Sequence, residues 1–436
     1  MPQTSSHSDH PTPDDVRRIQ RDKLREMGDV VCANNPFWRA RLGARWGTSL
    51  EDVYRVPILT RADLLDDQRL HPPYGTNLTF PLNEYCRLHQ TSGTTTGSPL
   101  RCIDRKADWD WWTRCWGKIF RAAGVTRDDR ILFPFSFGPF VGFWAAFESA
   151  VELGCLALPG GGMTTLARLQ FMADNAATVL CCTPTYALHM AEVARQQGID
   201  LSASTVRTLI VAGEPGGSIP STRKCIEAAF NARLFDHIGM TEVGAYAYEC
   251  AESPGTVHVN ETQFIAEVID PTTTQTKWSN LSSITTGAPV EGELVLTNLG
   301  RWGFPVIRYR TGDQVRLLTG QCACGSYFAR LEGGVIGRTD DMLVIRGNNV
   351  YPSALEAILR QFPAVAEYRL IVEGRDAMTD LRIEIEAAKG ITADGLADAV
   401  IQAVRDRFNF RPRVHLVSPG TLPRFEMKAQ RVFRQP

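Results

Sequence analysis

No run of apolar residues in this chain approaches the roughly 18 consecutive residues that a membrane-spanning helix needs. The N-terminal segment MPQTSSHSDHPTPDD is polar and lacks the apolar stretch of a secretory signal peptide. It is typical of a short disordered tail, which we expect over residues 1–13. Because both features are missing, the sequence predicts neither a membrane-spanning protein nor one secreted through a signal peptide.

An excess of charge of either sign is also missing. The 47 Lys and Arg residues face 48 Asp and Glu residues, so the formal net charge is -1. Without a positive surplus there is no electrostatic argument for binding nucleic acid or an anionic membrane surface. We therefore expect neither as a partner.

Paired cysteines are not indicated, because the chain has eleven cysteines, an odd number in a large sequence. Disulfide scaffolds are typical of small secreted domains with even cysteine counts. The composition therefore predicts reduced thiols and a cytoplasmic location.

What the sequence does have is length and a clear alternation of elements. A chain of 436 residues is too long for one compact core, so two or more domains are expected. The apolar spacing predicts helices over 14–31, 166–176 and 186–197 and buried strands over 131–135, 179–182 and 208–212. Strands are also expected at 265–269, 292–296 and 306–309. This alternation indicates an α/β fold with a largely parallel sheet.

The pattern changes after Gly337. Residues 342–345 are apolar, Ser353 and Glu356 have the spacing of a capping box, and Leu381–Ile385 alternates like a half-exposed strand. Leu396–Phe408 has helical spacing. We expect a large N-terminal domain over 14–337 and a small α+β C-terminal domain over 338–436.

The most distinctive local motif is HQTSGTTTGSP at residues 89–99. Two glycines let a backbone approach a ligand closely, and hydroxyl and backbone N–H groups can donate to phosphate oxygens. No Lys follows the second glycine, so this is not a Walker A loop. A polar surface loop is the alternative.

Further motifs follow in a fixed order: AGEP at 212–215, GMTEVG at 239–244, PVIRYRTGD at 305–313, GRTDDMLVIRGNNVYPSALE at 337–356 and LPRFEMKAQRV at 422–432. From about residue 85 to its end the chain resembles the phenylacetate–coenzyme A ligase family of the acyl-adenylate-forming superfamily. The resemblance implies a large adenylate-forming domain with mixed sheets and flanking helices, followed by a small mobile domain.

The chain departs from the family pattern at three places. Its hydroxyl-rich loop has an extra Thr, and Ser98 stands where a Lys or Arg often occurs. Ile238, with His237 beside it, replaces the family's Tyr, which removes a stacking partner for adenine. Phe143 stands where the family tends to have Gly, which narrows or reshapes the expected acid pocket.

The resemblance implies that the chain activates a small, aromatic carboxylic acid with ATP and passes the acyl group to coenzyme A. A carboxylate is a poor electrophile, and adenylation converts its oxygen into a good leaving group. Because the carboxylate and ATP are both negative, the site must supply positive charge.

Residue roles follow from the motifs by resemblance. Lys428 supplies positive charge to adenylation, Thr241 contacts the α-phosphate, and Glu242 holds Mg²⁺, which one carboxylate and phosphate oxygens suffice to bind. The nucleotide-binding set is Thr91, Ser92, Gly93, Thr94, Thr95, Thr96, Gly97, Gly213, Glu214, Pro215, Asp313 and Arg338, with Asp313 on the ribose hydroxyls. Asp340 matches the hinge. The alternatives are a solvated surface Lys428, a turn residue at 313 and a plain interdomain loop at 340.

The acid-binding residues implied by the resemblance are Phe135, Phe137, Phe140, His237 and Gly239. Aromatic walls with small glycine gaps suit a flat apolar acid. Packing in the hydrophobic core explains several of these rings equally well.

Four residues predict a structural zinc site. Cys322 and Cys324 form a C-x-C turn, and Cys250 and His258 precede it by about 64 residues or more. A Cys₃His set gives a closed tetrahedral zinc shell. Buried, reduced cysteines are the alternative.

Two other functions stay open. The acyl group could go to a carrier-protein phosphopantetheine or an amine, or the chain could be a non-catalytic binding homologue. The expected partners are the acid, ATP, and coenzyme A or a carrier protein, with a homodimer left open.

Overall fold

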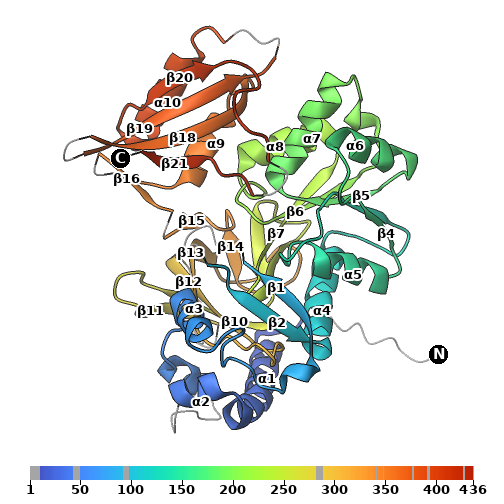
Figure 1. Ribbon diagram of the computed structural model, residues 1–436, viewed down its shortest axis with the longest axis vertical. Helices are drawn as coiled ribbons and strands as arrows, with labels where there is room; N and C mark the ends of the chain where they lie inside the picture. The colour runs from blue at the N-terminus through green and yellow to red at the C-terminus, as the bar shows by residue number, and fades with distance from the viewer. Residues whose placement is uncertain are drawn as a thin grey trace.

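The computed structural model describes residues 10–42, 50–91, 98–280, 288–339, 341–346, 348–375, 378–389, 393–425 and 428–435. In Figure 1 the orange-to-red elements at the C-terminal end form a smaller part at the upper left, beside green helices of the larger part. None of the helices in these ranges combines the length and apolarity that crossing a bilayer requires.

One half of the main sheet is parallel. Its strands lie in the order β7 (Arg233–Met240), β6 (Thr208–Ala212), β5 (Val179–Cys182), β3 (Arg130–Phe133) and β4 (Leu156–Pro159). Neighbours in this half pair in parallel. All four residues of β5 are buried, as expected for a strand covered on both faces.

The other half is antiparallel. From β7 it continues through β8 (Gly244–Glu249), β9 (Thr256–Val259), β14 (Arg330–Glu332), β13 (Tyr309–Leu318), β12 (Val290–Asn298), β10 (Phe264–Ile269) and β11 (Thr276–Ser279), and β15 (Gly337–Arg338) pairs with β13. The sheet changes from parallel to antiparallel pairing between β7 and β8. The turn that joins these two strands contains Thr241 and Glu242.

Helices cover the parallel half on both faces. They are α4 (Lys106–Ala122), α5 (Trp144–Glu152), α6 (Thr165–Asp174), α7 (Pro184–Gln196), the short η4 (Leu201–Ala203) and α8 (Pro220–Phe230). Helix α4 packs on β8 and α5, and α7 packs on α6 and α8. The buried side chains divide accordingly into two clusters, one of which holds α4 and the other α7 and α8.

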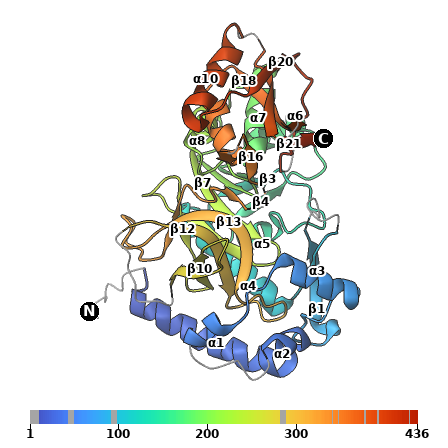
Figure 2. The ribbon, with the colours of Figure 1, turned by 90° about the vertical axis from the view of Figure 1, so that its left-hand side faces the viewer.

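The N-terminal segment lies at the base of the large part, as Figure 2 shows. It contains α1 (Pro13–Asn34), α2 (Pro36–Leu42), η2 (Leu50–Arg55), α3 (Arg61–Leu70) and η3 (Leu82–Glu84), followed by the hairpin β1 (Tyr85–Gln90) and β2 (Arg101–Arg105). Leu59 bridges to Tyr309 in β13 through backbone hydrogen bonds with Arg308 and Arg310 of 3.0 and 2.8 Å.

The C-terminal elements form a two-stranded sheet and a separate four-stranded sheet, with a core of their own. They are β16 (Leu343–Ile345), β17 (Asn348–Val350), α9 (Pro352–Leu359), β18 (Val365–Arg375), β19 (Met378–Ala387), α10 (Leu396–Phe408), β20 (Arg413–Val417) and β21 (Val432–Gln435). Strands β16 and β17 form the two-stranded sheet, and the order in the four-stranded sheet is β20-β19-β18-β21. The buried apolar side chains of these elements form one cluster of their own. The exact domain boundaries stay a prediction.

Most predicted elements are confirmed within one to three residues, including α1, α6, α7, α10 and the strands β5 and β6. Two local predictions are wrong. Residues 306–308 are not strand, because Arg308 has a φ of +50° and turns its buried guanidinium onto Glu267. Helix α9 has no capping box at Ser353, because Tyr351 is its N-cap, Pro352 begins it, and the Ser353 hydroxyl donates to the Ile336 carbonyl.

Candidate functional site

The hydroxyl-rich loop connects β1 to β2. Residues 92–97, which include Ser92, Gly93, Thr94, Thr95, Thr96 and Gly97, lie outside the described residues. The two ends of the loop are held by Arg61, whose Nη2 donates to Thr91 Oγ1 at 2.8 Å and to the Ser98 carbonyl at 3.4 Å. Thr91 Oγ1 also accepts from the Leu100 N–H at 3.0 Å.

A buried ion pair holds the main chain of the turn between β7 and β8. Arg301, only 1% exposed, donates from Nε and Nη2 to the two oxygens of Asp104 at 2.5 and 2.8 Å. Its Nη1 donates to the carbonyls of Thr241 and Glu242 at 2.7 and 3.1 Å. A planar guanidinium suits this task because its donors form a rigid fork. The main chain of Thr241 and Glu242 is therefore held in one position.

The side chain of Glu242 is buried beside Arg61. Its Oε1 accepts from the Tyr309 hydroxyl at 2.7 Å and lies 3.9 Å from Arg61 Nη1. Burial raises the pKa of Tyr309 well above its usual range, so the phenol stays a donor. Within the described parts of the chain, no group donates a hydrogen bond to the other oxygen, Oε2. Arg61 thus links the glycine-rich loop to this carboxylate.

Asp313 and Arg338 form a second polar pair. They face each other in the register of β13 and β15, and Arg338 Nη1 donates to Asp313 Oδ1 at 3.2 Å. Tyr246 donates its hydroxyl to Oδ2 at 3.1 Å. Asp313 is 5% exposed. Asp340, the predicted hinge, lies outside the described residues.

The segment Gly213–Pro215 follows β6 and meets the C-terminal motif. Gly213 has a φ of +98°, which favours glycine, and a Cβ at this position would lie 3.8 Å from the Cε of Lys428. Glu214 accepts from the N–H of Thr185 and from the N–H of Ala429, both at 2.9 Å. The structure therefore brings Lys428 to the end of β6, and Glu214 joins α7 to the residue that follows Lys428.

A chain of aromatic rings leads to His237 in β7, the strand that pairs with β6. The centroid separations are 5.4 Å from Phe137 to Phe135, 5.7 Å from Phe135 to Phe143 and 5.9 Å from Phe143 to Trp116. Trp116 then contacts His237 edge-on at 4.4 Å. Phe140 is partly buried and makes no ring contact among the described residues. Gly239 is exposed two residues beyond His237.

The four predicted metal ligands come together where β8, β9 and the β13–β14 connection meet. The ligand atoms of Cys250, His258, Cys322 and Cys324 all lie within 4.8 Å of one another. The sulfurs of Cys250 and Cys322 are 3.8 Å apart, and His258 Nε2 is 3.4 and 3.6 Å from the sulfurs of Cys250 and Cys324.

These separations fit one tetrahedral zinc ion. Two sulfurs about 2.3 Å from an ion at the tetrahedral angle lie about 3.8 Å apart, and a sulfur and a nitrogen about 3.6 Å apart. All four side chains are buried or partly buried.

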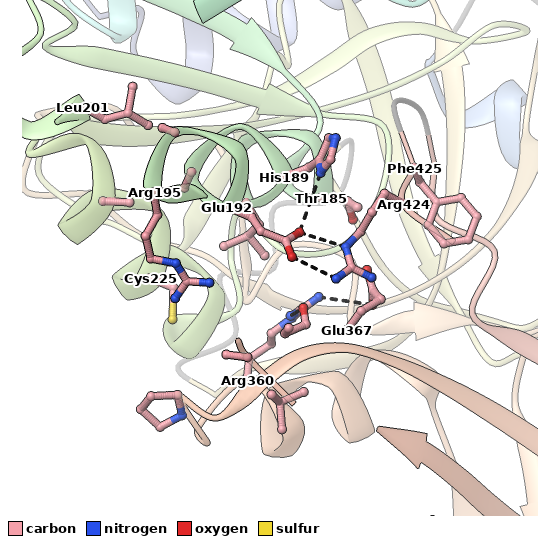
Figure 3. Close-up of a pocket in the computed structure, with 18 of the residues that line it drawn as sticks. Thr185, His189, Glu192, Arg195, Leu201, Cys225, Arg360, Glu367, Arg424 and Phe425 are labelled. Carbon is pink, nitrogen blue, oxygen red and sulfur yellow. Dashed lines mark hydrogen bonds and ion pairs between the residues drawn. The ribbon is translucent and has the colours of Figure 1, made fainter. Parts of the chain in front are cut away.

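The small part contacts the large part through charged residues. Arg424 Nε and Nη2 donate to the two oxygens of Glu192 in α7 at 2.8 and 2.9 Å, and Nη2 also donates to Glu386 at 2.7 Å. Arg431 pairs with Glu367 and reaches Thr185 Oγ1 at 3.3 Å. Figure 3 shows Thr185, Glu192, Glu367 and Arg424 at a cavity of about 440 Å³, which is lined by residues of α7, α8 and the C-terminal elements.

Several residues of this region carry no sequence motif that would identify them. Arg61 precedes the region of family resemblance, and Trp116 lies inside an ordinary amphipathic helix. Tyr309 lies inside the PVIRYRTGD motif and Arg301 lies shortly before it. Their partners Glu242 and Asp104 are 67 and 197 residues away. For Arg301 and Tyr309, their position in or near this motif is the only sequence signal that points to the site.

The C-terminal part matches a family model described as AMP-binding enzyme C-terminal domain, over residues 347–435. The whole chain is 31% identical to a phenylacetate–coenzyme A ligase of Pseudomonas putida, with 96% of this chain and 94% of the relative covered. It is 30% identical to the phenylacetate–coenzyme A ligase of Escherichia coli K12, with 96% and 95% covered.

Solved structures of a 2-hydroxyisobutyryl-CoA ligase are similar in two different states. The postadenylation state with 2-HIB-AMP has a TM-score of 0.88 at 26% identity and covers 100% of this chain and 94% of that one. The thioesterification state, with 2-HIB-AMP and CoA, has a TM-score of 0.70 at 28% identity and covers 97% and 90%. The structure of this chain as a whole is thus more similar to the postadenylation structure than to the thioesterification structure.

Proposed function

The chain belongs to the phenylacetate–coenzyme A ligase family, and from this premise we propose that it is an AMP-forming acid–thiol ligase. It activates a small carboxylic acid, of the aromatic class, with ATP. The carboxylate oxygen bonds to the α-phosphorus and pyrophosphate leaves. The thiol sulfur of coenzyme A then bonds to the acyl carbon, the thiol proton is released, and AMP leaves.

The observation that carries this proposal is the position of Lys428. It belongs to the C-terminal motif, yet its side chain lies against Gly213 at the end of β6. An ammonium here can neutralise the repulsion between the acid carboxylate and the α-phosphate. Charge aimed at the reacting oxygens is the largest contribution that such a site can make.

Thr241 and Glu242 are proposed to face the phosphates. Because Arg301 holds the carbonyls of both residues, their main chain is ordered before ATP binds. Oε2 of Glu242 accepts no hydrogen bond from a described residue. Glu242 would hold Mg²⁺, which offsets phosphate charge when bound. We add Arg61 to the proposed phosphate-binding residues, because it holds both ends of the hydroxyl-rich loop.

Asp313 and Arg338 are proposed to bind the ribose. A buried carboxylate can accept from both hydroxyls of a diol, and Arg338 and Tyr246 keep its oxygens oriented. Gly213–Pro215 would lie along the adenine through the main chain. The acid would lie near Phe135, Phe137, His237 and Gly239, in the aromatic surroundings that suit a flat ring.

The small part is proposed to move between the two half-reactions. Its present arrangement presents Lys428 to the end of β6, as adenylation requires. Transfer to coenzyme A would use the face around residues 347–352, with Asp340 as the hinge. A hinge needs only a few residues to absorb the dihedral change.

The proposal is tested by isotope exchange between pyrophosphate and ATP. A panel of aromatic and short-chain acids is offered singly, without coenzyme A. Exchange should appear only with certain acids, and adding coenzyme A should then give AMP and a thioester. Absence of exchange with every acid in the panel would contradict the ligase assignment.

A structural zinc ion is proposed at Cys250, His258, Cys322 and Cys324. When bound, zinc would join β8, β9 and the β13–β14 connection, and a closed four-ligand shell has no position for substrate. Its role is therefore stabilisation.

Purified protein should contain close to one zinc per chain, and chelation should lower the melting temperature. Cys322→Ser should lose the metal, while Cys86→Ser, at an exposed cysteine outside the cluster, should keep it. Less than about 0.1 zinc per chain in the unmodified protein would reject a tightly held site.

A further inference from the structure

His237 is a buried polar side chain in otherwise aromatic surroundings. It lies in β7, paired with Ala212 of β6 on one side and Tyr248 of β8 on the other, and is 5% exposed. Ala212 directly precedes Gly213, the residue next to Lys428. His237 thus lies between the ring cluster and the proposed site of acid activation.

The hydrogen bonds of His237 determine which ring nitrogen carries the proton. Nδ1 lies 2.8 Å from the Ala247 carbonyl oxygen, which can only accept. The proton is therefore on Nδ1. Burial lowers the pKa of His237 to about 4, so the ring is neutral at physiological pH. A neutral imidazole with its proton on Nδ1 has a lone pair on Nε2.

Nε2 points towards Gly239. A Cβ at Gly239 would lie 3.4 Å from this nitrogen, and Gly239 itself is exposed. Within the described ranges, no residue donates a hydrogen bond to Nε2. The same Cβ would lie 3.0 Å from the Gly244 carbonyl oxygen, so a larger residue at 239 would crowd the Nε2 acceptor, which has no hydrogen-bond donor among the described residues.

We propose that the acid substrate carries its own hydrogen-bond donor, a hydroxyl or amino group, which donates to Nε2 of His237. The inference rests on the proposed function, since it concerns the acid that this site activates. An acid with only apolar substituents that filled the space beside Nε2 would leave this acceptor unpaired, which is unfavourable. A pocket built to bind a hydroxyl discriminates strongly against the analogue that lacks it.

The test compares isosteric acids in the pyrophosphate exchange reaction. Benzoic and phenylacetic acids carrying a hydroxyl, an amino or a methyl group at the same ring position form matched sets. In the unmodified protein, the preferred hydroxyl or amino acid should exceed its methyl isostere by about 10-fold or more in kcat/KM. His237→Phe should bring this ratio close to one, while His415→Phe, at an exposed histidine of β20, should leave it unchanged.

A methyl acid that equals or exceeds its hydroxyl and amino isosteres at every ring position would overturn the inference but leave the ligase assignment intact. No exchange with any acid would instead reject the ligase assignment. A second measurement does not depend on the variant's folding. In ¹⁵N-histidine spectra of the intact protein, one neutral histidine should be protonated on Nδ1, and a neutral His237 protonated on Nε2 would also overturn the inference.

Discussion

At the scale of single residues, the site depends on a few side chains that hold others in place. Arg301 makes no contact with the proposed acid position, yet it fixes the carbonyls of Thr241 and Glu242. The Glu214 carboxylate accepts one main-chain hydrogen bond from each part of the molecule, from Thr185 and from Ala429. Both act on main-chain groups rather than on the side chains that are proposed to contact substrate.

Lys428→Ala should lower the rate of acyl-adenylate formation by about 100-fold or more, because it removes charge from the developing transition state. Thioester formation from preformed acyl-adenylate should be largely retained. The two half-reactions are measured separately, with Lys389→Ala in the same small part as the control. Equal loss in both half-reactions would refute the role given to Lys428.

Asp313→Asn should raise the KM for ATP by about 10-fold, because a charged acceptor for the ribose diol becomes a neutral amide. The KM for the acid should change little. Asp270→Asn is the control, since Asp270 is a carboxylate paired with Lys277 at 3.2 Å rather than with Arg338 or Tyr246. An unchanged KM for ATP would remove Asp313 from the nucleotide site.

At the scale of elements, the connection from β6 to α8 depends on glycine. Gly216 has a φ of +148°, and a Cβ there would lie 2.6 Å from the Cβ of Pro184 at the start of α7. Gly216→Ala should therefore lower the free energy of unfolding by about 2–4 kcal/mol, measured by denaturant titration.

Gly198→Ala provides the comparison. Gly198 also has a positive φ, +69°, but nothing lies within 4 Å of the position of a Cβ. Gly198→Ala should therefore lower the free energy of unfolding by only about 1–2 kcal/mol, the cost of placing a side chain in a left-handed backbone conformation. If both variants lose the same stability, the close approach to Pro184 contributes nothing.

Sequence patterns predict those elements whose partners do not alter their local preference. The strands β5 and β6 are apolar runs bounded by turns, and both have the predicted limits. Val306 and Ile307 are apolar in the same way, but the buried pair of Arg308 and Glu267 imposes a turn there. Ser353 likewise bonds to Ile336, a residue of another segment, instead of capping its own helix.

The site shows the same limit. The motifs identified Lys428, Glu242, Asp313 and the four cysteine and histidine residues as candidates, and the structure places each metal candidate beside the others. Arg61 and Trp116 could not be found in this way, because their contacts depend on tertiary packing rather than on a local pattern. The functional roles of all these residues stay predictions.

At the scale of the whole molecule, the ion pair between Arg424 and Glu192 stabilises one arrangement of the two parts. Burial tends to raise the pKa of Glu192, but the hydrogen bonds and charges of Arg424 and His189 together outweigh this and lower it to about 2. The pair is therefore ionised at neutral pH. Its contribution is fully present above the ordinary value of 4.5 and is lost as the pH falls towards 2.

Glu192→Gln should weaken this contact by about 1 kcal/mol, or roughly fivefold in the ratio of the two arrangements. Acyl-adenylate formation should slow, and thioester formation from preformed acyl-adenylate should not. Glu384→Gln is the matched control, because Glu384 pairs with Arg369 and Arg382 within the small part. The same effect from both variants would contradict a role for this interface.

The bridge from Leu59 to Tyr309 and the pair of Asp104 with Arg301 also have a consequence for synthesis of the chain. The segments that contain Leu59 and Asp104 leave the ribosome long before their partners, which lie about 200 residues or more further on. Such distant contacts close large loops and form late. In a nascent chain that ends before residue 301, Asp104 therefore lacks the cation with which it is buried in the folded structure, and the turn that contains Thr241 and Glu242 acquires its support only when most of the large part has been made.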